Sequence, residues 1–202
     1  MTRLNAGLLG QLIGKVGNVV VVNRGKTTYV RSMPNYANTV WTDRQKQVRK
    51  RFGLVGRFCS KYKKNLIIPI WNLKPGNSSG YNQFLTANIK AFDIDGNIMD
   101  MSLLHFSQGN LPPACSVSIE KQQAQVTISW KNELYTPDIR LKDKLWYMAV
   151  VDGQIVGPYS SGLTRGMLGG VFTLKDPATS AIYAYFAASD KKSFSPDKYL
   201  AL

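Results

Sequence analysis

The feature that most constrains the fold is a change in the spacing of apolar residues along the chain. Between residues 48 and 66 they recur every three or four positions, whereas from about residue 114 they alternate with polar residues. The first spacing places side chains on one face of a helix, and alternation places them on one face of a strand. The sequence therefore predicts an α+β chain whose helical region precedes a β-rich region.

The helical region should begin near Thr42. Gln45 follows Thr42 by three residues, which is a capping-box signature, because each side chain can bond to an unpaired backbone amide at the helix start. The apolar residues that follow have 4-3-4-3-4 spacing and define one buried seam: Val48, Phe52, Val55, Cys59, Tyr62 and Leu66.

Five cations lie on the opposite side of the same helix. We call them the basic stripe: Lys46, Lys50, Arg57, Lys61 and Lys64. A charged stripe is usually a solvated helix face, but such faces normally carry both signs, and no acid is interleaved here. Two interpretations stay open: the stripe is a solvated helix face, or it is a binding site for an anion or an acidic partner.

Two more elements are expected before residue 111. Val19–Val22 and Thr27–Val30 are β-rich runs around a loop with Asn23 and Gly25, which predicts a hairpin. Residues 81–92 carry Tyr81, Phe84, Leu85, Asn88, Ile89 and Phe92 at helical spacing, which predicts a short second helix packed on the first.

Two short motifs resemble ligand-binding loops but lack required parts. Gly14-Lys15 resembles the end of a phosphate-binding loop, yet Leu9 stands where the first glycine belongs, and Val16 stands where Ser or Thr would bind magnesium. Residues 93–97 resemble a calcium loop, but the glycine comes two positions early and no Glu closes the loop. A plain turn is expected at residues 93–97.

The alternating region predicts six or seven short strands and an antiparallel sandwich of the immunoglobulin or fibronectin III type. Residues 124–130 alternate and end on Trp130, which should be the core tryptophan. Residues 145–151 are apolar on both faces, as in a central strand. The aromatic residues expected in or near this core are Tyr147, Phe172, Tyr183 and Tyr185.

Charge changes along the chain together with the apolar spacing. Residues 1–90 hold 16 Lys or Arg against one acid, which gives 16 − 1 = +15; residues 91–202 hold 10 against 11, which gives 10 − 11 = −1. We therefore expect a basic region of hairpin and helices at 1–110 and a sandwich at 111–202 that folds alone. The basic region should bind an acidic partner: nucleic acid, an anionic membrane surface or an acidic protein.

The composition argues against most enzyme chemistry. One His and two Cys stand far apart at His105, Cys59 and Cys115, which does not suit a zinc site, and the two Cys are expected as free thiols. His105 lies in an apolar run, where a packed or hydrogen-bonded role is expected. Because no nucleophile, base and orienting group can be named together, we expect no enzymatic activity, no cofactor and no metal.

The chain shows no export signal and no apolar run of membrane-spanning length, so we expect cytoplasmic synthesis. Incorporation into a virion or other particle is a hypothesis drawn from fold analogy, because many-stranded sandwiches recur in phage-like particles and surface assemblies.

The opening of the chain resembles that of a family of uncharacterised Bacteroidota proteins of about 200 residues. The residues that carry the resemblance are Gly14-Lys15-Val16-Gly17-Asn18-Val19-Val20, Arg31-Ser32 with Pro34, and Gln47 with Arg51-Phe52. It extends through Ser129-Trp130 to Tyr183-Ala184-Tyr185-Phe186, Ser195 and Tyr199-Leu200. The family has no assigned activity, so the resemblance implies no site. The second half is similar to fibronectin type III sandwiches, which are usually interaction modules.

Two functions are compatible with these features. The first is a structural or assembly protein whose basic region docks onto an acidic protein or its own copies, while the sandwich contacts a neighbour. The second is a nucleic-acid binder that uses cations interleaved with aromatics, such as Arg51-Phe52 and Arg57-Phe58. The seam should bury Phe52 and Tyr62, which leaves mostly Phe58 for base stacking. This favours the assembly protein.

Overall fold

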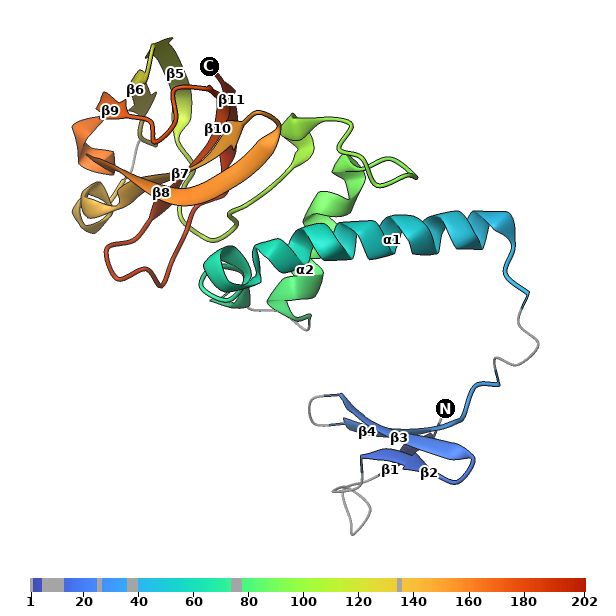
Figure 1. Cartoon of the computed structure of the whole chain (residues 1–202). Helices are drawn as coiled ribbons and strands as arrows, with labels where there is room; N and C mark the ends of the chain where they lie inside the picture. The colour runs from blue at the N-terminus through green and yellow to red at the C-terminus, as the bar shows by residue number, and fades with distance from the viewer. Residues whose placement is uncertain (1, 5–12, 25–26, 36–39, 74–77, 134–135) are drawn as a thin grey trace. The chain divides into compact units, whose positions relative to one another are not determined.

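The computed structural model describes residues 2–4, 13–24, 27–35, 40–73, 78–133 and 136–202 (Figure 1). The chain divides into two units, Met1–Asp43 and Arg44–Leu202. Each unit has its own secondary structure.

The first unit contains a four-stranded antiparallel sheet. Its strands are β1 (Thr2–Leu4), β2 (Gly14–Val16), β3 (Val19–Arg24) and β4 (Thr27–Ser32), in the order β1-β4-β3-β2. The predicted hairpin is confirmed, with Val22 opposite Tyr29. Gly14 and Lys15 belong to β2, and Gly17 makes the turn into β3 with φ +56°. Lys15 therefore lies on a strand and not in a phosphate-binding loop.

The second unit begins with helices. They are α1 (Asp43–Lys61), the π-helical turn η2 (Lys63–Ile67), the 3-10 turn η3 (Trp71–Leu73), α2 (Gly80–Asn88), and the 3-10 turns η4 (Ile89–Ala91) and η5 (Met101–Leu103). The two predicted helices are confirmed, and α1 begins one residue after Thr42. The Tyr81 hydroxyl donates to the Gly56 carbonyl over 3.0 Å, which ties α2 to α1.

Two antiparallel sheets follow the helices. The larger has the order β11-β10-β7-β8, from β7 (Lys144–Val151), β8 (Gln154–Thr164), β10 (Thr179–Ala187) and β11 (Lys198–Ala201). The smaller has the order β5-β6-β9, from β5 (Cys115–Gln122), β6 (Gln125–Lys131) and β9 (Gly169–Thr173). The 3-10 turns η6 (Asp138–Lys142) and η7 (Arg165–Met167) lie in the connections. The predicted strands form a sandwich-like pair of sheets.

One core lies between the two sheets. Alternate residues of β6, namely Val126, Ile128 and Trp130, are buried against Leu145, Tyr147, Ala149, Ile182, Ala184 and Phe186 of the larger sheet. Trp130 is only 3% exposed, as expected for the core tryptophan. Its indole Nε1 donates to the Arg165 carbonyl over 3.2 Å, and its ring meets that of Phe186 at 5.4 Å.

A second core lies between the helices and the outer face of the larger sheet (Figure 1). The helical region contributes Val55, Cys59, Leu66, Trp71, Phe84 and Phe106, and the sheet contributes Met148, Val150, Ala181, Tyr183, Tyr185 and Ala187. Because β7 and β10 are covered on both faces, both read as continuous apolar runs. The second unit is therefore three layers deep: helices, larger sheet, smaller sheet.

The second core corrects two expectations. Tyr147 and Phe172 lie between the sheets, but Tyr183 and Tyr185 face the helices. The expected boundary at residue 111 also differs from the observed division after Asp43. The switch in charge and apolar spacing marks a change of secondary structure inside one unit, because the helices share a core with the strands that follow.

Candidate functional site

The predicted seam of α1 is buried only in its second half. Val55 and Cys59 are fully buried, and Tyr62 is 8% exposed, whereas Val48 is 60% exposed and Phe52 is 53% exposed. The expectation that Phe52 is buried was therefore wrong. Periodicity identifies which residues share a face, but whether another element covers that face depends on the tertiary structure.

The basic stripe is exposed along its whole length, although its last member lies outside α1. The helix ends at Lys61, and Lys64 belongs to the π-helical turn η2, where the Ile67 amide reaches back five residues to the Tyr62 carbonyl. A π-turn inserts about one extra residue, so helical angles counted from α1 do not carry across it. The expected alignment of Lys64 with the stripe is therefore approximate.

The cations of the stripe differ in their partners. Lys50 forms an ion pair with Asp95 at 2.9 Å, in which both side chains are about 60% exposed, so it adds little stability. No acid is interleaved with the stripe, and the one that pairs with Lys50 comes from the turn at residues 93–97. Within the described ranges, Arg57, Lys61 and Lys64 have no ion pair or hydrogen bond to the rest of the chain. These three are the cations best placed for an external anion.

The aromatic residues of α1 occupy the opposite places from those expected. Phe58 packs within the second core, with ring centroids 5.1 Å from Tyr62 and 5.0 Å from Phe92, so it is not available for base stacking. Phe52 is the exposed aromatic of the helix instead. It follows Val48 by one helical turn, and Arg49 and Arg51 precede it in the sequence.

The second half of α1 is held firmly by the rest of its unit. The Arg51 guanidinium donates to the Ile89 carbonyl over 2.6 Å. Leu54 packs against Gly96, whose φ of +84° and lack of Cβ allow the turn at residues 93–97 to approach the helix. In that turn, Asp93 accepts hydrogen bonds from the backbone amides of Asp95 and Asn97, and these lower its pKa. These contacts fix the second half of α1, and the exposed first half extends from it.

His105 has the hydrogen-bonded role that its sequence context suggested. Its Nδ1 lies 3.5 Å from Oδ1 of Asp197, and the Asp197 carboxylate is 1% exposed and accepts the backbone amides of Phe106 and Ser107. The bond to Asp197 raises the pKa of His105, against an opposing effect of burial. The buried Asn88 side chain holds the backbone of His105 through both its oxygen and its nitrogen. The pair thus joins the helical region to the segment before β11.

Protonation of His105 should add a small pH-dependent stability. Its folded pKa is raised above the ordinary 6.5, so the contribution is complete below about pH 6.5 and is lost as the pH rises through the folded value. Because the imidazole is half exposed, we expect about 0.2 to 1 kcal/mol. Urea unfolding of the wild type and of His105→Gln at pH 5 and pH 8 measures this contribution. The wild type should exceed the variant in free energy of unfolding by more at pH 5 than at pH 8. A larger difference at pH 8 would contradict this assignment.

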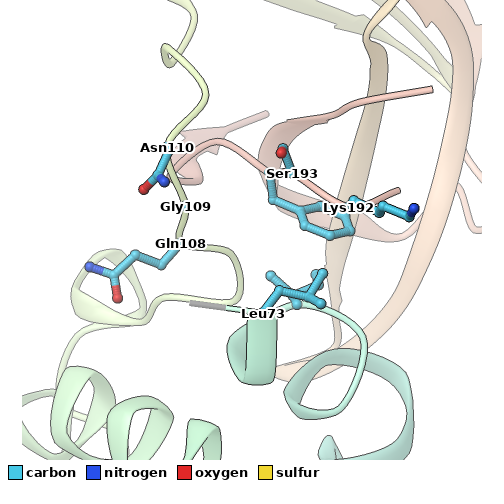
Figure 2. A pocket seen from close by; sticks show the side chains of 8 residues that line it. Leu73, Gln108, Gly109, Asn110, Lys192 and Ser193 are labelled. Atoms are coloured by element: carbon cyan, nitrogen blue, oxygen red, sulfur yellow. The ribbon is translucent and has the colours of Figure 1, made fainter. Parts of the chain in front are cut away.

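Two pockets lie near His105. One of about 140 Å³ lies beside His105 and Asp197, but the hydroxyl of its Ser107 donates to the Ser195 carbonyl at 2.7 Å. Figure 2 shows a neighbouring pocket of about 40 Å³, room for a few waters, where Gln108 and Lys192 point away from each other. Burial raises the pKa of the Cys59 thiol to about 12, which leaves it unreactive.

No group of three or more His, Cys, Asp and Glu suited to a metal ion occurs in the described residues. No helix in the same residues has the length and apolar character needed to cross a membrane.

Comparisons with protein families, with curated proteins and with solved structures found no match for this chain. The candidate functional site is the surface of α1, where Val48, Phe52 and the basic stripe are exposed.

Proposed function

We propose that this chain is a non-enzymatic structural or assembly protein. Its basic region docks onto an acidic protein surface, and its sandwich, which we relate to the immunoglobulin and fibronectin III type, contacts a neighbour. The docking surface has two opposite sides of α1, the exposed Val48 and Phe52 on one and the basic stripe on the other, so the partner encloses the exposed first half of the helix. Membership of a phage-like or cell-associated particle is part of this proposal and rests on analogy of fold.

The observation that carries the proposal is the exposure of two apolar side chains one turn apart on a strongly basic helix. Nine Lys or Arg and no acid occur between residues 44 and 64. Protein interfaces are enriched in aromatic residues and Arg, and a few such residues supply most of the binding energy. A complementary partner offers an apolar pocket to Phe52 on one side of the helix and carboxylates to the basic stripe on the other. The cations would speed association, and the apolar pair would slow dissociation.

The second candidate function is nucleic-acid binding, and one observation favours it. Phe52 is an exposed aromatic that directly follows Arg51 on a helix rich in Lys and Arg, which suits stacking on an unpaired base. Val48 separates the two candidates, because an aliphatic side chain fills an apolar pocket of a protein but offers no ring for base stacking. We favour the acidic protein because Val48 and Phe52 together form an apolar pair.

Replacing Arg57, Lys61 and Lys64 by Gln should weaken binding to an acidic partner about tenfold at low salt, since each exposed charge contributes about 0.2 to 1 kcal/mol. The three side chains are exposed and outside the core, so folding should be intact. Fluorescence anisotropy with a labelled Glu-rich peptide that contains leucines measures the loss. The loss of affinity should become smaller as the salt concentration rises, because salt screens exposed charges that are more than about 8 to 10 Å apart at physiological ionic strength.

The matched control replaces three other exposed cations, Lys131, Lys144 and Lys198, and changes the net charge equally. A single-stranded oligonucleotide tests the second candidate, for which the Gln variant should show a shallower salt dependence. Val48→Ser should weaken the peptide and leave the oligonucleotide unchanged. If wild type binds neither polyanion at physiological salt, or if the control variant loses as much affinity as the stripe variant, the stripe is only a solvated face.

A further inference from the structure

A separate pocket of about 220 Å³ lies where the larger sheet meets the segment that follows η2. Its walls are mostly apolar and come from Pro69 and Ile70, from Trp146 of β7, from Pro158 of β8, and from Phe194. Ligand sites are typically concave and apolar, with a few polar groups that set orientation. The volume is below the usual range for drug-sized molecules and suits a body of about one ring.

The polar groups at this pocket include hydrogen-bond donors. Lys191 lines the pocket, and its Nζ lies 5.0 Å from the centroid of the Trp146 ring. Tyr185 is only 3% exposed, yet its hydroxyl has no hydrogen-bond partner among the described residues. Burial raises the pKa of Tyr185, which keeps its hydroxyl protonated as a donor. The indole Nε1 of Trp146 is buried and has no hydrogen-bond partner among the described residues. A buried donor without a partner is unusual and favours a ligand that supplies an acceptor.

The charge at the pocket is positive. No Asp or Glu lines it, and the nearest acid in sequence, Asp190, already accepts a hydrogen bond from the Lys192 amide at 3.0 Å. An anionic head is therefore favoured over a cationic one. A phosphate would have to lose its hydration against apolar walls, whereas a carboxylate on an apolar body matches both the walls and the ammonium group.

We propose that this pocket binds a small carboxylate with an aromatic or branched aliphatic body. The body lies between Trp146 and Phe194, and the carboxylate faces Lys191 and accepts a hydrogen bond from Tyr185. This site is independent of the docking surface on α1, so either proposal can fail without the other.

Titration of the ¹⁵N-labelled full chain with 3-phenylpropionate tests the proposal, with the neutral 3-phenylpropionamide as the matched probe. The indole signal of Trp146, assigned through Trp146→Phe, should shift with a dissociation constant below about 1 mM. The amide should bind about tenfold more weakly, because a hydrogen bond to a charged group is stronger than one between neutral groups.

Lys191→Gln should weaken the carboxylate about tenfold and leave the amide unchanged, and Tyr185→Phe should weaken both probes. Lys198→Gln is the control, because it removes an exposed charge on β11 outside the pocket lining. No shift of the Trp146 signal up to 10 mM, equal affinity for the two probes, or unchanged carboxylate affinity in Lys191→Gln would each overturn the proposal.

Discussion

Replacing Trp130 by alanine should lower the free energy of unfolding by about 3 to 5 kcal/mol. The ring is 3% exposed, fills the space between the two sheets, and meets the ring of Phe186 edge to face. Its removal leaves a cavity, since the surrounding strands are held by their own hydrogen bonds and can collapse only in part. It also leaves the buried Arg165 carbonyl without the indole donor.

Chemical unfolding followed by circular dichroism measures this effect, and Ser129→Ala supplies the control. Ser129 neighbours Trp130 on β6 but faces outward and is exposed, so its replacement should change stability by no more than about 0.5 kcal/mol. An effect of Trp130→Ala below about 1 kcal/mol would mean that the ring is not buried and that the register of β6 differs from the one described.

A fragment that begins at Leu111 should not fold into a stable domain, although the sequence pattern suggested that it would. Without the helices, the outer face of the larger sheet exposes Met148, Val150, Tyr183 and Tyr185, which are at most 4% exposed in the whole chain. An apolar patch of that size is unfavourable in water and promotes aggregation. The fragment 44–202 keeps both cores and should unfold cooperatively.

Size-exclusion chromatography and thermal unfolding of the two fragments test this expectation. The longer fragment should elute as a folded species with one cooperative transition, whereas the shorter should aggregate or show no transition. A soluble 111–202 fragment with a cooperative transition equal to that of 44–202 would show that the helices add nothing to the stability of the sheets.

Local patterns in the sequence predicted most of the elements, because they depend on spacing within one segment. The alternation of residues 124–130 predicted β6 and the burial of Trp130, and the seam predicted α1 with the correct face inward from Val55 onward. The doubly apolar run of β7 also predicted a central strand, but its two covering layers could not be identified from spacing alone.

The features that were missed depend on contacts between distant segments. The buried Arg165 lies 3.5 Å from Asp143, 22 residues away, and its guanidinium covers the Phe186 ring at 3.9 Å. In sequence it is an ordinary cation. The short strands β1 and β2 carry too few residues for a clear alternation.

The candidate site was predicted in part. The five residues of the basic stripe are exposed as expected, but the argument from missing acids overlooked Asp95, which reaches Lys50 from 45 residues away. The exposure of Val48 and Phe52 was not predicted. The spacing of an apolar seam does not indicate how far along the helix another element covers it. Those two residues now carry the functional argument.

Photo-crosslinking from position 52 tests the central claim most directly. A benzophenone amino acid replaces Phe52 in the full chain, in the cells that make the protein, and the same group at the exposed Val171 of β9 is the control. We predict nuclease-resistant adducts between position 52 and an acidic protein surface, reduced when Arg57, Lys61 and Lys64 are replaced by Gln. Adducts with nucleic acid, or no more adduct from position 52 than from position 171, would contradict the account.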